Sequence, residues 1–220
     1  MNEQSLLDRQ RGLMLKAIHS NYLNPTKRSR RLSVLMSIRN EPSASQHKIA
    51  KCANLSSSMV NNYIKCLKEE GFITVTGNTN RTQSYHLTRH GQNELRESLL
   101  AYSSEIVQLY SAVKCEIAQI MKGFYQEGIR TLVLFGVAET AEVVFAAIKN
   151  SPLVVIGVVD SDPAKQGRPF NGLIVQEPQK LQEINPDAVV ITSFGRQDEI
   201  HECIRGLVGD KIKVKKLTEV

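Results

Sequence analysis

Six apolar residues between Thr88 and Glu127 recur at intervals of four, three, four, three and four, which is the spacing of one long amphipathic helix. They are Leu95, Leu99, Tyr102, Ile106, Leu109 and Val113. A helix over this stretch would be on the order of 55 Å long. A helix of this length predicts that one folded module precedes it in the chain and another follows it. A repeat this regular favours pairing with the helix of a second copy, and the alternative is a connecting helix that packs on its own two modules.

The charge is distributed unevenly between these modules. Residues 1–90 hold 14 Lys and Arg against 5 Asp and Glu, whereas residues 91–128 hold 3 against 5 and residues 129–220 hold 11 against 12. The net charge of +6 therefore comes from the first module, which carries +9. A basic module joined to a near-neutral one indicates a polyanion partner for the first and another task for the second. The alternative is a surface with a basic bias and no such partner.

Several classes of protein are excluded by composition. Hydrophobic residues make up 41% of the 220 residues and charged residues 23%, which suits packed domains rather than disorder. No run of about 18 apolar residues occurs, so we expect no membrane span. The N-terminus, Met1 to Asp8, lacks the apolar region of a secretory signal. The cysteines form no CxxC pair, so we expect reduced thiols in a cytoplasmic protein: Cys52, Cys66, Cys115 and Cys203.

The chain divides into four predicted segments. Residues 1–31 would form an amphipathic helix over Glu3–His19 followed by a basic arm, Lys27–Arg31, that touches DNA or is solvated. Residues 32–90 form the first folded module. Residues 91–128 form the long helix that links the modules and pairs two copies, and residues 129–220 form the second module.

The order of elements in residues 32–90 predicts a winged helix. A short helix over Leu32–Ile38 is followed by one that Ser45 caps, and then by one that Ser56 or Ser57 caps and Gly71 ends. Strands follow at residues 72–76 and 82–87, and turn-forming residues 77–81 lie between them. Thr88 is a candidate N-cap for the long helix.

One face of the third predicted helix has the chemistry of a DNA-reading surface. Val60, Ile64 and Leu67 form its buried stripe, so short hydroxyl and amide side chains lie on the opposite face. Asn can bond adenine in a bidentate way, and Lys can reach a guanine edge or a phosphate. The alternative is a winged helix that contacts protein. The predicted DNA-binding residues are Arg28, Arg30, Arg31, Gln46, Ser57, Ser58, Asn61, Asn62, Lys65, Asn80 and Arg81.

These segments carry a family resemblance over about 60 residues. Gln46–Ala50, Leu55-Ser56, Val60–Ile73 and Tyr85–Gly91, with its Leu-Thr-x-x-Gly ending, resemble the MarR-type winged helix. The similarity is greatest to the small regulators associated with exopolysaccharide gene clusters. It implies that Ser57 to Lys65 lie on a recognition helix that binds double-stranded DNA, and that Arg81 lies on the wing.

The last module reads as an α/β domain with a Rossmann-like parallel sheet. Apolar strands are predicted at 131–135, 153–159, 188–192 and 212–215, with helices at about 139–149, 178–184 and 197–208. Continuous apolar strands that alternate with helices indicate a parallel sheet covered on both faces. The complete fold prediction is an α+β winged helix-turn-helix, a long linker helix and this α/β domain.

A degenerate glycine loop follows the first of these strands. Gly136 keeps the first position of a GxGxxG loop, whereas Ala138 replaces its second glycine and Glu139 brings a negative charge. Asp160 follows the second strand, where an acid can hold ribose hydroxyls or end a turn. A ligand would lie beyond the carboxyl ends of the strands, and the candidates are Gly136, Ala138, Asp160, Lys165, Arg168, Ser193 and Gly195.

A second resemblance covers nearly all of residues 130–208. Val158–Arg168, Asn171–Val175 and Asn185–Ile191 are similar to the Rossmann-like domains of sugar acyltransferases, to the region before the dehydratases of polysaccharide synthesis, and to the sensor domain of NADH-responsive redox repressors. It implies a nucleotide, a nucleotide-sugar or NAD(H) as ligand, although no cofactor is certain and the glycine loop departs from all three families.

Three functions follow from these patterns. The first is a dimeric, DNA-binding transcription regulator with a Rossmann-like domain that senses a small effector or assembles. The second is a subunit of a sugar-nucleotide enzyme, for which the sequence offers no triad, metal cluster or nucleophile elbow, so we expect no enzyme. The third is a scaffold whose Rossmann-like half is an empty interaction module. His86, in a predicted wing strand, is expected to pack rather than to react.

Overall fold

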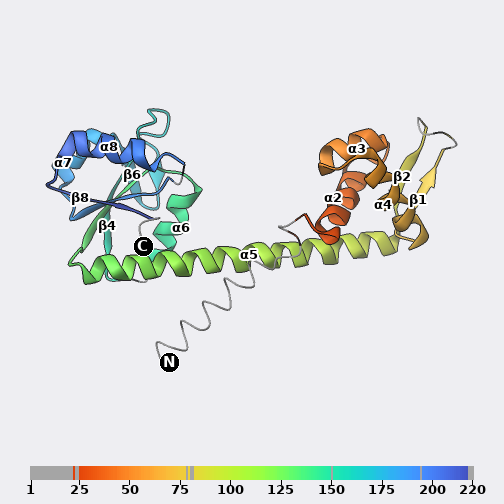
Figure 1. The fold of residues 1–220 in the computed structure, drawn as a ribbon, viewed down its shortest axis with the longest axis horizontal. Coiled ribbons are helices and arrows are strands. Elements are labelled where there is room, and N and C mark those ends of the chain that lie inside the picture. The colour runs from red at the N-terminus through yellow and green to blue at the C-terminus, as the bar shows by residue number, and fades with distance from the viewer. Residues whose placement is uncertain are drawn as a thin grey trace, which may run out of the picture. The chain divides into compact units, whose positions relative to one another are not determined.

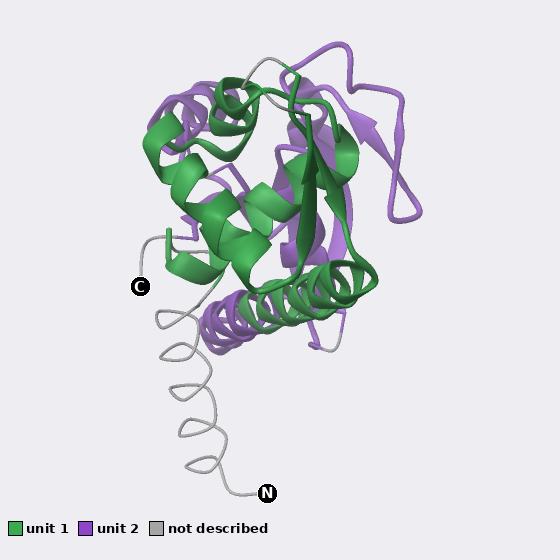
Figure 2. Cartoon of the chain, turned by 90° about the vertical axis from the view of Figure 1, so that its right-hand side faces the viewer, with its two compact units in different colours: residues 1–109 green, residues 110–220 purple. Residues whose placement is uncertain are grey.

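The chain folds into two compact units, residues 1–109 and 110–220 (Figures 1 and 2). The computed structural model describes residues 22, 25–77, 79, 82–149, 151–193 and 195–217. The predicted helix over Glu3–His19 lies outside the described residues, as do Asn80 and Arg81. The boundary between the units falls inside one long helix, α5 (Arg89–Gln126), so each half of that helix is described with its own unit.

Unit 1 begins with three helices whose ends follow the sequence signals. They are α2 (Lys27–Asn40), α3 (Gln46–Ala53) and α4 (Ser57–Glu69). The Ser45 and Ser56 hydroxyls accept hydrogen bonds from backbone N–H groups three residues on, at 3.2 Å each, so the predicted N-caps of α3 and α4 are confirmed. Asn54 adopts the left-handed conformation, φ 52°, in the tight turn between these two helices.

A two-stranded wing follows α4. Strands β1 (Ile73–Thr76) and β2 (Ser84–Leu87) pair antiparallel, with Ile73 opposite Leu87. The core beneath is built from buried side chains of all these elements, including Leu35, Ile49, Ile64 and Tyr85.

The start of α5 is fixed to the end of α4 by the Leu-Thr-x-x-Gly segment. The Thr88 hydroxyl donates to the Gly71 carbonyl at 2.7 Å and accepts from the Gly91 N–H at 3.0 Å, so it caps α5 as predicted. A Cβ at Gly91 would lie 1.9 Å from the Phe72 carbonyl oxygen. Only glycine allows α5 and the Gly71–Phe72 turn to approach this closely, which gives the motif a physical reason.

Helix α2 differs from its prediction at one end. It begins at Lys27 rather than near Leu32, so the basic residues of the predicted arm occupy its first turns. The Thr26 hydroxyl caps it by accepting from the Ser29 N–H at 3.3 Å. The helix sets the directions in which the side chains of Lys27–Arg31 leave the backbone, and Lys27 and Arg28 remain exposed.

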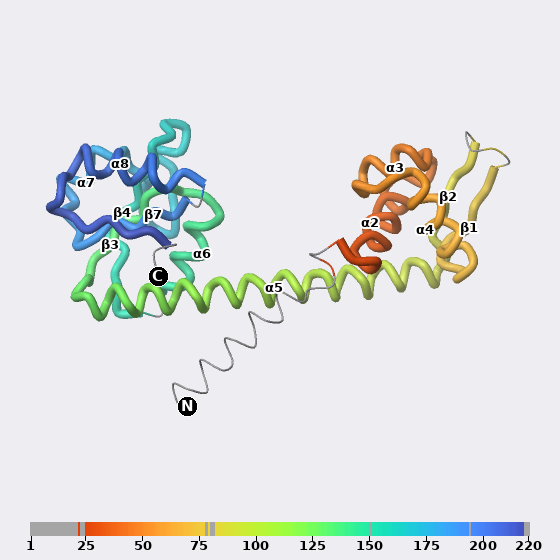
Figure 3. The backbone as a smooth tube through the Cα atoms, in the orientation of Figure 1, coloured from red at the N-terminus to blue at the C-terminus, as the bar shows by residue number. Residues whose placement is uncertain are grey.

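Unit 2 contains a six-stranded sheet in the order β5-β6-β4-β3-β7-β8, traced in Figure 3. Its parallel strands are β3 (Thr131–Phe135), β4 (Val154–Val159), β6 (Leu173–Gln176), β7 (Ala188–Ile191) and β8 (Lys213–Lys216). Numbered along the chain, these five lie in the order 3-2-1-4-5. The predicted parallel sheet is therefore confirmed.

Two apolar clusters cover the two faces of this sheet. One joins the last turns of α5 and α6 (Glu139–Ile148) to residues such as Leu132 and Val158. The other joins α8 (Gln197–Val208) and the short α7 (Leu181–Ile184) to residues such as Val133 and Ile191. A 3₁₀ turn, η1 (Pro178–Lys180), precedes α7 where a single helix over 178–184 was predicted.

A hairpin at the sheet edge was not predicted. Strand β5 (Pro169–Phe170) pairs antiparallel with β6 through the two-residue turn Asn171-Gly172. Both turn residues have positive φ, 49° and 87°, which is the requirement of a type I′ turn.

The long helix α5 has 38 residues, and most of its predicted heptad seam packs within the units. Leu95 is buried in the core of unit 1, and Leu99 and Tyr102 pack against that core. Val113 packs against the core of unit 2, which also buries Ile117 and Phe124. Ile106 is 40% exposed, and Leu109 is half-buried and belongs to neither core. Four of the six residues thus pack within the units, and the contact of α5 with a second copy stays a prediction. Among the described residues, no helix combines the length and the apolar character needed to cross a membrane.

Candidate nucleic-acid interface and ligand cavity

The outer face of α4 presents the predicted polar side chains. Val60, Ile64 and Leu67 are buried as predicted, whereas Ser57, Ser58, Asn62 and Lys65 are exposed and Asn61 is half-buried. The Ser58 hydroxyl lies 2.9 Å from that of Ser56, which holds it at the start of the helix. Gln46, in the first turn of α3, is half-buried. The face offers hydroxyl, amide and ammonium groups with no carboxylate until Glu69.

Basic residues of α2 adjoin α4 on two sides. Lys27 and Arg28 line one hollow together with Asn62, Tyr63 and Cys66. Arg30 lines another together with Ser29, Ser33, Ser56 and Met59. The first turns of α2 therefore add positive charge beside the N-terminal half and the middle of α4, where phosphates would flank a helix in a groove.

Arg31, one of the predicted DNA-binding residues, has several partners within unit 1. Its guanidinium forms a bidentate ion pair with Glu70, lies 3.8 Å from Glu94, and stacks 4.8 Å from the centre of the Phe72 ring. These contacts join α2 to the end of α4 and to the start of α5, because Glu94 belongs to α5. The Arg31 side chain is therefore already engaged within unit 1.

The other cations near α4 differ from Arg31 in this respect. Within the described residues, Arg28, Arg30 and Lys65 have no carboxylate within ion-pair distance. Unit 1 also pairs Lys48 with Glu41 at 2.6 Å on its surface. The positive charge beside α4 is thus not neutralised by the described part of the protein.

Unit 2 has a cavity at the carboxyl ends of β3, β4 and β7, with a volume of about 270 Å³. Five of the predicted ligand residues line it: Gly136, Ala138, Asp160, Lys165 and Ser193. Arg168 and Gly195 do not line it. In a sheet of order 3-2-1-4-5 this is where the chain turns from one half of the sheet to the other, which is the usual place of a ligand.

Asp160 is the best-connected residue of the cavity, and it is 5% exposed. Its carboxylate accepts from the Val137 N–H at 2.8 Å, from the Asp162 N–H at 2.9 Å and from the Lys165 ammonium at 3.1 Å. Burial alone raises the pKa of the carboxyl, but the N–H groups of Asp162 and Val137 and the Lys165 ammonium together hold its pKa below the ordinary value.

This bonding ties the β3–α6 loop to the loop after β4. Gly136, with φ 102°, needs the freedom of glycine to make the β3–α6 turn. The Thr192 hydroxyl, from the end of β7, donates to the carbonyls of Phe135 at 2.8 Å and Gly136 at 2.6 Å. The helix that follows has no side-chain cap at Ala138 and carries Glu139 and Glu142 in its first turn.

Sequence reasoning missed several residues of this cavity, including Ser161, Asp162, Thr192 and Arg196. Each lies within a few residues of a strand end, and this position is the signal that would have found them. Arg196 pairs with Glu199 at 2.7 Å. Across the described residues, no group of three or more His, Cys, Asp and Glu is placed to hold a metal ion.

Comparison with protein families identifies one model for each unit. Residues 27–106 match a family model described as winged helix-turn-helix, and residues 128–214 match one described as C2185-like, N-terminal. The first match agrees with the observed order of α2, α3, α4 and the wing, so unit 1 contains a winged helix-turn-helix. No curated protein matches the chain.

Several solved structures share a distant likeness with the chain. BpsR of Bordetella bronchiseptica, whose DNA binding is regulated by 6-hydroxynicotinic acid, is 16% identical over 50% of this chain and 79% of its own, with a TM-score of 0.37. MepR, a transcription regulator of a Staphylococcus aureus efflux pump, is 17% identical over 58% and 96%, with a TM-score of 0.37. The zinc-dependent MarR family regulator AdcR is 17% identical over 58% and 99%, with a TM-score of 0.35. These likenesses are too distant to assign a function.

Proposed function

We propose that the protein is a DNA-binding transcription regulator of the MarR type. Its winged helix-turn-helix would read DNA with α4 as the recognition helix. Ser57, Asn61, Asn62 and Lys65 would face base edges and phosphates, and Arg28 and Arg30 would contact the flanking backbone. Asn80 and Arg81 remain proposed wing contacts.

The observation that carries this proposal is the unneutralised charge around α4. A folded unit usually places carboxylates near its cations, as this protein does at Arg31. Arg28, Arg30 and Lys65 have none within ion-pair distance in the described part of the chain, and they surround a helix face of hydroxyls and amides. Such a surface suits the phosphates of a nucleic acid better than a protein partner.

Binding to DNA from upstream of the protein's own gene tests this function. The full chain would be titrated with this DNA and with random DNA of equal length across a salt series. We expect a specificity ratio of about 10³ or more at physiological salt. Weak binding that is equal for the two DNAs and lost at moderate salt would overturn the proposal.

The regulator would act as a dimer through the middle of α5. Leu100 is 66% exposed, Val107 62% and Tyr110 43%, and they follow one another at intervals of seven and three. Together with Ser103, these residues form a second heptad line, rotated from the line that packs within the units. A second copy of α5 is the partner that this spacing fits, and a winged-helix dimer would place two recognition helices about one DNA turn apart.

Unit 2 would be a Rossmann-like sensor. Its strand order is that of the first five strands of the doubly wound fold, and its cavity lies at the corresponding switch point. Asp160 would position the two loops rather than bind ribose, because its three acceptor contacts are already made. A small polar ligand, such as the sugar or phosphate part of a nucleotide-sugar, is the size of occupant that about 270 Å³ favours.

A scaffold role for unit 2 is the second candidate. The engaged Asp160 and the crowded position of Ala138 are the observations that favour it. A thermal-shift panel of NAD(H), nucleotides and nucleotide-sugars distinguishes the two. A rise in the melting temperature with one class supports the sensor, and no shift with any of them supports an empty interaction module.

A further inference from the structure

Helix α4, the proposed recognition helix, is held at its C-terminal end by a side chain from another helix. Arg31 of α2 forms a bidentate ion pair with Glu70, the residue that directly follows α4. The Arg31 Nε atom is buried, and the guanidinium lies 4.8 Å from the centre of the Phe72 ring, which is 8% exposed. Arg31 is therefore packed at the point where the chain leaves α4.

The contacts of Arg31 also reach the start of α5. The Glu94 carboxylate, on α5, lies 3.8 Å from the Arg31 Nε atom. The Phe72 ring, which contacts Arg31, stacks on the ring of His90 with 4.5 Å between the ring centres. Among the ion pairs of the described residues, the two of Arg31 are those that tie α2 to the end of α4 and to α5.

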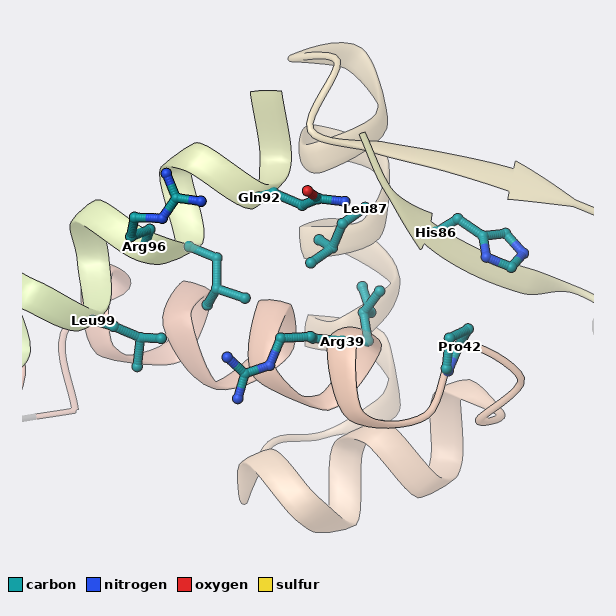
Figure 4. A pocket seen from close by; sticks show the side chains of 9 residues that line it. Arg39, Pro42, His86, Leu87, Gln92, Arg96 and Leu99 are labelled. Atoms are coloured by element: carbon teal, nitrogen blue, oxygen red, sulfur yellow. The ribbon is translucent and has the colours of Figure 1, made fainter. Parts of the chain in front are cut away.

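These polar contacts carry weight because α2 and α5 do not close on each other along their whole length. About two helical turns beyond Arg31, a hollow of about 530 Å³ lies between α2, β2 and α5 (Figure 4). Ile38 of α2 and Leu95 of α5 line it and belong to one apolar core. Apolar packing is not directional, whereas a bidentate guanidinium pair fixes a geometry. The ion pairs of Arg31 are therefore suited to set the angle between these helices.

The orientation of α4 matters for DNA reading because its polar residues lie far from its fixed end. The helix has 13 residues and is therefore about 18 Å long. A tilt of about 5° at Glu70 would move Ser57, at the other end, by about 1.5 Å. A hydrogen bond to a base edge is lost over such a distance.

We propose that Arg31 is a positioning residue for DNA reading: through Glu70 and Glu94 it sets the orientation of α4 against α2 and α5, and it does not itself bind DNA. This role, which rests on the proposed function, differs from the DNA contact predicted from the sequence. A misplaced α4 would lose the base contacts of Asn61 and Asn62, while contacts to phosphates carry no sequence information and tolerate a small shift. Loss of Arg31 should therefore reduce specific binding more than binding to random DNA.

Competition binding of the full chain to upstream and random DNA tests this role. Arg31→Gln and Glu70→Gln should each lower the ratio of the two affinities about tenfold, with less than about a threefold change for random DNA. The double variant should be no worse than either single variant, because both break the same ion pair. Arg31→Lys should not restore the ratio, because an ammonium group cannot form the bidentate pair.

The salt dependence of the affinity separates positioning from direct contact. Arg31→Gln should leave the slope of log K against log[salt] unchanged, whereas Arg30→Gln, the matched variant on the same helix, should lower it by about 1. A lowered slope for Arg31→Gln, or tighter binding of Glu70→Gln to both DNAs, would mean that Arg31 contacts a phosphate and would overturn the proposal. Unchanged ratios, or an equal loss of affinity for both DNAs, would overturn it as well.

A milder variant and the parent protein complete the test. Glu94→Gln keeps the pair between Arg31 and Glu70 and removes the link to α5 alone, so it should lower the ratio about threefold. A parent protein that binds both DNAs equally would overturn the proposed function and this role of Arg31 with it. A specific parent whose variants all keep its ratio would overturn the role of Arg31 alone.

Discussion

The cations beside α4 in unit 1 and those around the cavity and helices of unit 2 differ in how many of them the protein pairs with carboxylates. In unit 2, six lysines and arginines pair with nearby carboxylates: Lys165 with Asp160, Lys180 with Glu183, Arg196 with Glu199, Arg205 with Asp210, Lys215 with Glu127 and Lys216 with Asp198. In unit 1, Arg31 and Lys48 are paired, whereas Arg28, Arg30 and Lys65 beside α4 have no such partner among the described residues.

From this difference we expect external anions to bind beside α4, where the cations have no carboxylate partner among the described residues. Surface ion pairs contribute little to stability, about 0–1 kcal/mol each, so pairing in unit 2 serves mainly to neutralise its surface. Cations that a fold leaves unpaired on one face are available to a ligand. Under the proposed function, the face around α4 is therefore the polyanion-binding surface of unit 1, whereas unit 2 has a small cavity at the carboxyl ends of its strands.

The largest expected effect is on the free energy of unfolding, and it has opposite signs for a glycine in unit 1 and a glycine in unit 2. Gly91→Ala should destabilise unit 1 by about 3 kcal/mol or more, because the new Cβ would overlap the Phe72 carbonyl oxygen. Gly123→Ala, in the same helix, adds a Cβ with no atom within 4 Å and should stabilise by about 0.5–1 kcal/mol. Thermal unfolding by calorimetry measures both. Similar melting of the two variants would contradict the close approach at Gly91.

The next effect concerns the proposed dimer. Leu100→Lys combined with Val107→Lys should weaken self-association about 100-fold, because it places like charges on the exposed heptad line. Gln108→Lys, exposed on the same helix but off the line, is the control. Sedimentation measures the dissociation constant. A dimer that tolerates the double variant would have its interface elsewhere.

A smaller effect is expected from substitutions on the polar face of α4 that is proposed to contact DNA bases. Asn61→Ala should reduce discrimination between upstream and random DNA by about 1–3 kcal/mol, because a bidentate amide contact to a base is lost. Ser161→Ala, in the cavity of unit 2, should have no effect on this ratio. Competition binding at fixed salt provides both values. An unchanged ratio for Asn61→Ala would remove this residue from the interface.

An effect of similar size is expected on the stability of unit 2 when Asp160 is replaced. Asp160→Asn should cost about 1–3 kcal/mol, because one of the N–H and ammonium partners loses its acceptor. The folded-state pKa of Asp160 lies below its unfolded value, so its contribution is present above the unfolded pKa and is lost as the pH falls through the folded pKa. The difference in unfolding free energy between parent and variant should therefore shrink as the pH falls from neutral through the acidic range. A free-energy difference that stays constant with pH would contradict a stabilising role for the ionised Asp160 carboxylate.

Local signals in the sequence predicted most of the elements. The caps at Ser45, Ser56 and Thr88 and the stop at Gly71 depend on neighbouring backbone groups only, so the sequence specifies them. The β5–β6 hairpin was missed although Asn171-Gly172 is a strong turn signal, because its strands are too short to alternate. The start of α2 was missed because Lys27–Arg31 has no apolar periodicity.

Tertiary roles were harder to predict. The heptad spacing of α5 established a long helix, but it could not tell a partner helix from the protein's own cores, since both require apolar residues at the same intervals. Five of the seven predicted ligand residues line the cavity, because they lie in the loops that follow strands. The role of Arg31 could not be found, because Glu70 and Glu94 approach it only in the folded unit.

The salt dependence of DNA binding tests the central comparison most directly. Arg28→Gln, Arg30→Gln and Lys65→Gln in unit 1 would be compared with Arg168→Gln and Lys149→Gln in unit 2, each removing one positive charge. We predict that each unit 1 variant lowers the slope of log K against log[salt] by about 1, while the unit 2 variants leave it unchanged. Equal changes in both sets would contradict the account, because DNA would then respond to net charge rather than to the surface around α4.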